Sequence, residues 1–167
     1  ATVSGGNNGV MVLYTAETAN IVATQGAITT PVPFAVTVSA SGMNKFVVNL
    51  STPQTNGGVF AGTNSVTAQD VYGNTVTSYS AATNSVTIAA VSPLTGAVSG
   101  LSGGNKLTNA SDFVTGVANL TALGMKYTGN AGTGTFTASS TTGGYIGTSG
   151  SVVINSGSAT QIAVNAG

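Results

Sequence analysis

Charge is the property that this chain most lacks. Six of its 167 residues, or 4%, are charged at neutral pH, whereas globular domains usually carry about a quarter. The six are three acids and three lysines spread along the sequence: Glu17, Asp70, Asp112, Lys45, Lys106 and Lys126. Because acid has so few carboxylates to protonate, we expect the fold to be nearly indifferent to pH.

Arginine, histidine and cysteine are absent, and their absence argues against several classes of protein. Without histidine or cysteine the chain offers no ligands typical of zinc or other transition metals, and it forms no disulfides. Three lysines cannot neutralise a track of phosphates, so we expect no nucleic-acid partner. Acid–base and nucleophilic catalysis need the groups that are scarcest here, so we expect neither an enzyme nor a cofactor. No apolar run reaches the length of about 18 residues that predicts a membrane span.

Threonine, glycine, serine and asparagine are abundant instead, and together they make up 84 of the 167 residues. Threonine and valine favour strands, whereas glycine, asparagine and serine favour turns, which predicts an all-β protein with many short strands. Apolar and polar residues alternate in six runs: Phe34–Ser39, Phe46–Leu50, Thr75–Tyr79, Ser85–Ala89, Gly134–Ala138 and Ser151–Ile154. A further segment, Ser111–Leu120, fits a helical or a strand period, and its central Thr and Gly favour a strand. This spacing is typical of a β-sandwich or barrel.

One turn is predicted by its residue types, at Asp70, Gly73 and Asn74. An Asp or Asn side chain can bond nearby backbone groups, and Gly can adopt a positive φ, so the chain reverses here between two strands. A calcium site needs several converging oxygens and usually more than one carboxylate. Asp70 has no acidic neighbour in sequence, so we interpret the motif as a turn and expect no metal.

Three N-glycosylation sequons begin at Asn49, Asn109 and Asn119. A chain so rich in asparagine, serine and threonine also produces sequons by chance, so each is a candidate for an N-linked glycan. The first residues lack the basic and apolar regions of a secretory signal, so this start is either cytosolic or the processed end of a mature protein, and Ala1 in place of a methionine favours processing. Together with the uncharged polar surface, this start leads us to expect a secreted, extracellular protein in its processed form.

The chain divides by pattern into an N-terminal arm (residues 1–42), a sandwich (43–157) and a C-terminal extra strand (158–167). The arm carries alternating apolar residues suited to adding a strand to the open sheet edge of another copy: Val10, Val12, Tyr14, Ile21 and Ala23. The C-terminal strand is a second candidate donor. The alternative is that the arm folds back as extra strands of its own sandwich. Few lysines and prolines are available to protect sheet edges, which favours self-association.

The segment Ala61–Tyr79, which ends in VTAQDVYGNTVTSY, resembles the start of prokaryotic immunoglobulin-like repeat modules. Lys45–Gly58 and Gly150–Ser156 resemble the first and last strands of such a module, and Ala159–Gly167 resembles the opening strand of a following one. With its arm, sequons and charge-poor composition, the chain resembles the subunits of thread filaments of thermoacidophilic archaea. That resemblance implies an immunoglobulin-like β-sandwich with an extended N-terminal strand arm, glycosylation, secretion, and polymerisation with copies of itself by strand donation.

Two other hypotheses remain open from the residues alone. The chain is alternatively a cell-surface adhesin or carbohydrate-binding immunoglobulin-like module, which predicts a monomer or array with an aromatic or polar patch on its loops. The lysines and acids are ordinary surface charges, or else they take part in Lys–Asn isopeptide bonds assisted by a buried acid. Lysine and acidic side chains are seldom buried, which favours the interpretation that they are ordinary surface charges.

Overall fold

The computed structural model describes residues 11–158, and within them the protein is all-β, as its composition predicts. One short 3-10 turn, η1, interrupts the strands. The elements are β1 (Thr18–Ile21), β2 (Thr24–Gln25), β3 (Ile28–Thr29), β4 (Phe34–Thr37), β5 (Lys45–Asn49), β6 (Gln54–Thr55), β7 (Ser65–Gln69), β8 (Val86–Val91), β9 (Ala97–Ser99), β10 (Lys106–Leu107), η1 (Ala110–Asp112), β11 (Val117–Asn119), β12 (Lys126–Thr128), β13 (Gly132–Ser140), β14 (Ile146–Thr148) and β15 (Val152–Asn155).

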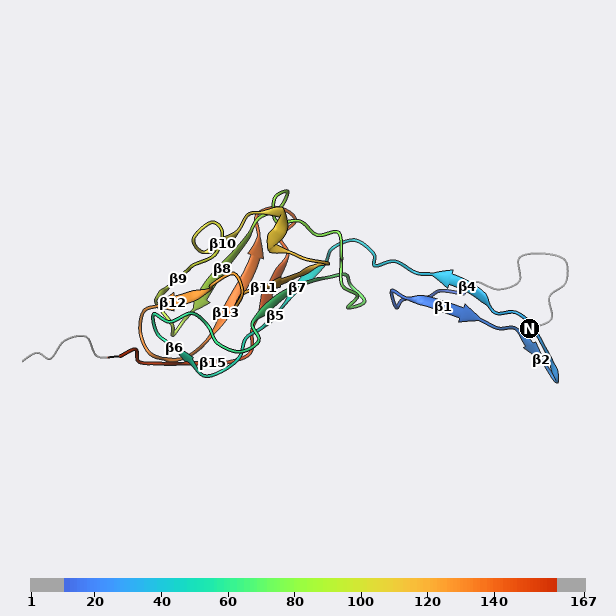
Figure 1. Cartoon of the computed structure of the whole chain (residues 1–167), viewed down its shortest axis with the longest axis horizontal. Helices are drawn as coiled ribbons and strands as arrows, with labels where there is room; N and C mark the ends of the chain where they lie inside the picture. The colour runs from blue at the N-terminus through green and yellow to red at the C-terminus, as the bar shows by residue number, and fades with distance from the viewer. Residues whose placement is uncertain (1–10, 159–167) are drawn as a thin grey trace, which may run out of the picture.

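A larger and a smaller sheet, together with the two-stranded pair of β9 and β12, form a sandwich-like body, which we define as the part of the chain from β5 to β15. The larger sheet has the strand order β10-β8-β13-β15-β6, and β14 also pairs with β13. The smaller sheet has the order β11-β7-β5, so β5 lies at its edge. The long strand β13 organises the larger sheet, because β8 pairs along one edge while β15 and β14 pair with successive parts of it. Figure 1 shows these sheets gathered on one side of the molecule.

The core of the body lies between the sheets and is rich in aromatic rings. The burial of β7 and β13 alternates along each strand, as expected when one face of a sheet is covered. Phe136 meets Phe60 and Tyr127 edge to face, with ring centroids 5.6 and 5.7 Å apart. Such edge-to-face contacts are a favoured arrangement of aromatic side chains, so this cluster packs β12 and the segment before β7 onto β13.

The strand predicted at Thr75–Tyr79 is wrong. Only Thr75 joins a ladder there, through an isolated bridge to Gln69, and the chain then turns as the N–H of Tyr79 donates to the carbonyl of Val76 at 3.1 Å. Val76 is buried and Tyr79 is half-buried, so both apolar side chains pack into the body from a turn. Alternation of apolar residues thus arises here without a strand.

The ambiguous segment Ser111–Leu120 is neither one helix nor one strand. It contains the last residues of η1 and then β11, separated by a tight turn. Thr115 and Gly116 in that turn both have positive φ, at 47° and 81°. The central Thr and Gly, which favour a strand over a helix, are therefore the residues that break the segment in two.

Candidate functional site

The N-terminal hairpin, residues 18–37, is the part of the structure that stands apart from the body. β1 pairs antiparallel with β4, and β2 with β3 at the tip, where Gly26 has a φ of 59°. None of these four strands pairs with a strand of the body. Figure 1 shows the hairpin extending away from the body along the long axis of the molecule. The alternative that this segment adds strands to its own sandwich is therefore wrong for residues 18–37.

The hairpin has one apolar and one polar face, because residues paired across a ladder point to the same side. Ala19 pairs with Val36 and Ile21 with Phe34, which makes one face apolar. On the other face the hydroxyls of Thr18 and Thr37 lie 3.2 Å apart. Several large apolar side chains of residues 20–35 are exposed to solvent: Val22 (47%), Ile28 (75%), Val32 (76%) and Phe34 (72%).

The predicted donor residues do not form one continuous strand. Val10 lies outside the described residues, and Val12 and Tyr14 are exposed in irregular backbone before β1. Ile21 ends β1, and Ala23 follows it. The hairpin between residues 18 and 37 was not predicted, although Gly26 is the kind of residue that signals its turn. The possible donor strand at the C-terminus falls on residues 159–167, outside the described part.

The turn from Asp70 to Asn74 holds the base of the hairpin. The carboxylate of Asp70 accepts hydrogen bonds from the N–H groups of Tyr72 and Asn74, each at 2.9 Å or less, and Gly73 has a φ of 90°. The structure therefore places Asp70, Gly73 and Asn74 in one turn. The same carboxylate accepts from the N–H and the hydroxyl of Ser41, at 2.9 and 3.2 Å, and so fixes the chain that leaves the hairpin.

Asn74 binds the chain that enters the hairpin. Its Oδ1 accepts from the N–H of Ala16 at 2.8 Å, and its Nδ2 donates to the carbonyl of Tyr14 at 2.7 Å. Nδ2 also donates to Asp70 at 2.9 Å, which orients the amide. The rings of Tyr14 and Tyr72 lie against each other with centroids 4.6 Å apart. The sequence did not indicate the roles of Ser41, Ala16 or Tyr72, because these contacts join segments distant in the chain.

Elsewhere in the body, three other side-chain amides also form two hydrogen bonds with the backbone, one as donor and one as acceptor. The pairs are Gln54 with Ala61, Asn56 with Gly129, and Asn84 with Thr142. In each pair one amide group supplies both a donor and an acceptor to the two backbone groups of a single residue. Because a neutral amide does not titrate, these contacts hold loops to each other, and at Gln54 hold a loop to β6, at any pH.

The carboxyl of Asp70 is fully buried. Burial by itself would raise its pKa, but hydrogen bonds from the side chain of Asn74 and from the N–H groups of Ser41, Asn74 and Tyr72 outweigh that effect. They hold the pKa of Asp70 well below its usual range. Burial also raises the pKa of Tyr79 to about 12, with a smaller contribution from Tyr145.

Acid should therefore destabilise the protein only at low pH. A carboxylate with a lowered folded pKa stabilises the fold above its unfolded value of about 3.9, and this contribution is lost as the pH falls from there through the folded value. We expect the free energy of unfolding to show no fall due to Asp70 between pH 7 and about 4.5, and to decline below about pH 4. Urea unfolding measures the free energy of unfolding across this pH range. The variant Asp70→Asn should show a smaller decline of this free energy below about pH 4. A decline of equal slope in that variant would contradict the assignment to Asp70.

The second aspartate is also buried, whereas the lysines are exposed. Asp112 is 4% exposed and accepts hydrogen bonds from the N–H groups of Thr108 and Asn109 and from the hydroxyl of Ser102. The expectation that all six charges are ordinary surface charges is therefore wrong for Asp70 and Asp112. At both aspartates, hydrogen bonds from neutral groups compensate for the burial of the carboxylate. Lys45, Lys106 and Lys126 are exposed, as is Glu17.

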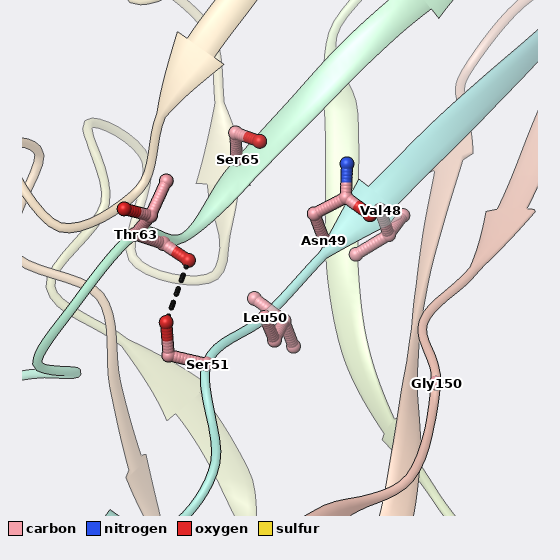
Figure 2. Close-up of a pocket in the computed structure, with 7 residues that line it drawn as sticks. All are labelled: Val48, Asn49, Leu50, Ser51, Thr63, Ser65 and Gly150. Atoms are coloured by element: carbon pink, nitrogen blue, oxygen red, sulfur yellow. Dashed lines mark hydrogen bonds between the residues drawn. The ribbon is translucent and has the colours of Figure 1, made fainter.

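An open pocket of about 480 Å³ lies at the end of edge strand β5. Its lining residues are Val48, Asn49, Leu50, Ser51, Thr63, Ser65 and Gly150. Figure 2 shows them on three segments, with the hydroxyl of Ser51 bonded to the carbonyl of Thr63 at 2.9 Å. The pocket contains no aromatic side chain and no charge, so it suits apolar and neutral polar groups.

The three sequon asparagines all lie at exposed positions. Asn49 ends β5 beside the pocket, Asn109 precedes η1, and Asn119 ends β11. The side chain of Asn119 accepts from the N–H of Ala122 at 3.0 Å. Exposure leaves each of the three accessible to a glycan.

No family model, curated protein or solved structure matches this chain. Within residues 11–158, no helix is long and apolar enough to cross a membrane. The same residues contain no group of three or more His, Cys, Asp or Glu side chains placed to hold a metal ion.

Proposed function

We propose that this protein is the structural subunit of an extracellular cell-surface filament. In this proposal the body is an immunoglobulin-like head, and the N-terminal segment that contains the hairpin is donated to the next copy. The observation that carries the proposal is a hairpin that pairs with no strand of its own body while Ile28, Val32 and Phe34 are each more than 70% exposed. Two-stranded hairpins alone are marginally stable in water, so contact with another surface that buries these side chains would stabilise this one.

The body offers a place for such a segment at the Val48–Asn49 end of β5, which pairs with β7 on one side and lies beyond the contact of β14 with Phe46. Edge strands present unpaired backbone groups, and β5 carries no charged residue after Lys45 to discourage pairing. The uncharged pocket at the end of β5 supplies space for side chains of an added strand. Donor and acceptor are different surfaces, so repeated pairing produces an open filament unless the rotation closes.

The remaining features suit a filament outside the cell. Neutral amides do not titrate, and the lowered pKa of Asp70 keeps its carboxylate ionised at moderately acidic pH, which suits a mildly acidic medium. N-linked glycans on Asn109 or Asn119 belong to the same proposal, since both are exposed and neither lines the pocket, whereas a glycan on Asn49 would compete with an added strand there.

Removal of residues 1–38 tests the proposal. The buried core runs from Phe46 to Ile154, so we expect the shortened chain to unfold cooperatively on heating but to form no filaments. Size-exclusion chromatography and electron microscopy, with the full chain as the control, measure both properties. Filaments formed by the shortened chain would refute donation by the N-terminal segment.

A further inference from the structure

The two ends of the hairpin meet the body at one turn. Ser41 follows the hairpin and binds Asp70, whereas Tyr14 and Ala16 precede it and bind Asn74. The N–H of Val38 donates to the carbonyl of Glu17 at 2.8 Å, so the ladder continues to the base of the hairpin. Figure 1 shows the loop between β7 and β8 reaching from the body toward this base. A hairpin attached by one chain end could swivel, but one held at both ends has a defined direction.

The contact at Asn74 joins two backbone groups that lie on either side of a bend at Thr15. Its amide donates to the carbonyl of Tyr14 and accepts from the N–H of Ala16, two positions later. Asp70 holds the same amide from the other side, and Asp70 is itself fixed by the N–H groups of the turn. The amide therefore has little freedom to adopt another orientation.

We propose that Asn74, oriented by Asp70, is the positioning residue that fixes the direction of the N-terminal hairpin relative to the body. Resting on the proposed function, this makes the turn the element that sets the angle between successive subunits of the filament. The hairpin then acts as a rigid lever, so that each subunit presents its donor segment to the next at one angle.

Distance measurements between two spin labels test this directly, because the chain has no cysteine to interfere. Labels are placed on Ala27→Cys at the hairpin tip and Ala122→Cys on the body, both exposed positions. The labelled full-length chain is diluted into unlabelled copies, so that only distances within one molecule are measured. We expect one narrow distance distribution for this reference protein.

Two variants remove the contact from opposite sides. Asn74→Ala removes the side-chain amide. Ala16→Pro removes the N–H that donates to this amide, and it leaves the sequence of the body unchanged. We expect both to broaden the distribution, with the population of other orientations rising by a factor of about ten for the two hydrogen bonds lost in Asn74→Ala. Ala16→Pro keeps the test valid if Asn74→Ala fails to fold.

Asn84→Ala is the matched control, because it removes an equivalent amide pairing, with Thr142, inside the body. Its distribution should stay as narrow as that of the reference protein even where its melting temperature falls. Narrow distributions in both junction variants, or equal broadening in Asn84→Ala, would overturn the proposal. The distances are read within single molecules, so they remain informative if no filament forms, which would count against the proposed function alone.

Discussion

Phe34→Asp should abolish filament formation while leaving the body folded. Phe34 is 72% exposed on the apolar face of the hairpin and lies outside the buried core, so its replacement costs the single subunit little. Burial of a large apolar side chain against a second copy contributes about 1.5–3 kcal/mol, and burial of an unpaired charge in its place costs more. Together these effects should weaken association by at least about a thousandfold. Sedimentation of polymer across a range of protein concentrations measures the change.

The neighbouring residue supplies the control for this experiment. Ala35 is exposed on the opposite face of β4 and pairs with Asn20, so Ala35→Asp adds the same charge on the polar side. We expect this variant to form filaments at close to the normal concentration. Equal loss in both variants would indicate that added charge, rather than the apolar face, disrupts assembly. Normal assembly of Phe34→Asp would exclude this face from the contact between copies.

Gly147→Ala should destabilise the body severely. β14 packs directly on β5, and a Cβ at Gly147 would overlap the backbone carbonyl oxygen of Phe46 and approach its carbonyl carbon to 2.7 Å. Because a backbone group cannot move aside as a flexible side chain does, the two strands must separate. Overpacking typically costs about 1–3 kcal/mol and sometimes more, and we expect about 3 kcal/mol or above here. Denaturant unfolding at neutral pH measures it.

Gly150→Ala is the matched control in the same part of the chain. A Cβ at Gly150 meets nothing within 4 Å, and this glycine does not have a positive φ. We expect its stability to be unchanged or raised by up to about 1 kcal/mol, because alanine restricts the unfolded chain. Equal stability of the two variants would show that β14 and β5 are not in close contact.

The sequence predicts the parts of this fold that depend on neighbours along the chain. The content of Thr, Val and Gly predicts an all-β protein, and the Asp, Gly and Asn at positions 70, 73 and 74 fit the turn that is seen there. Alternation alone does not identify the partner of a strand, so the pairing of β1 with β4 was missed. The same limit explains the wrong strand at Thr75–Tyr79, where alternating side chains pack from a turn.

Contacts between distant segments escaped prediction for a related reason. Asn74 and Ala16 are 58 residues apart, and an asparagine that binds a remote backbone group has the same local sequence as one in any turn. Likewise, no local signal distinguishes Gly147, which permits a close approach, from Gly150, which faces open space. The scarcity of charge indicated such contacts only indirectly. With few charged partners available, buried polar groups must form their hydrogen bonds with amides, hydroxyls and backbone groups.

Electron cryo-microscopy of the purified full-length protein tests the central claim most directly. The account predicts filaments in which the N-terminal segment of one copy lies against the body of the next, with added strand density at the Val48–Asn49 end of β5 beside the pocket. Particles that remain single copies at micromolar concentration, or filaments whose contacts leave that segment and the pocket end of β5 exposed, would contradict it.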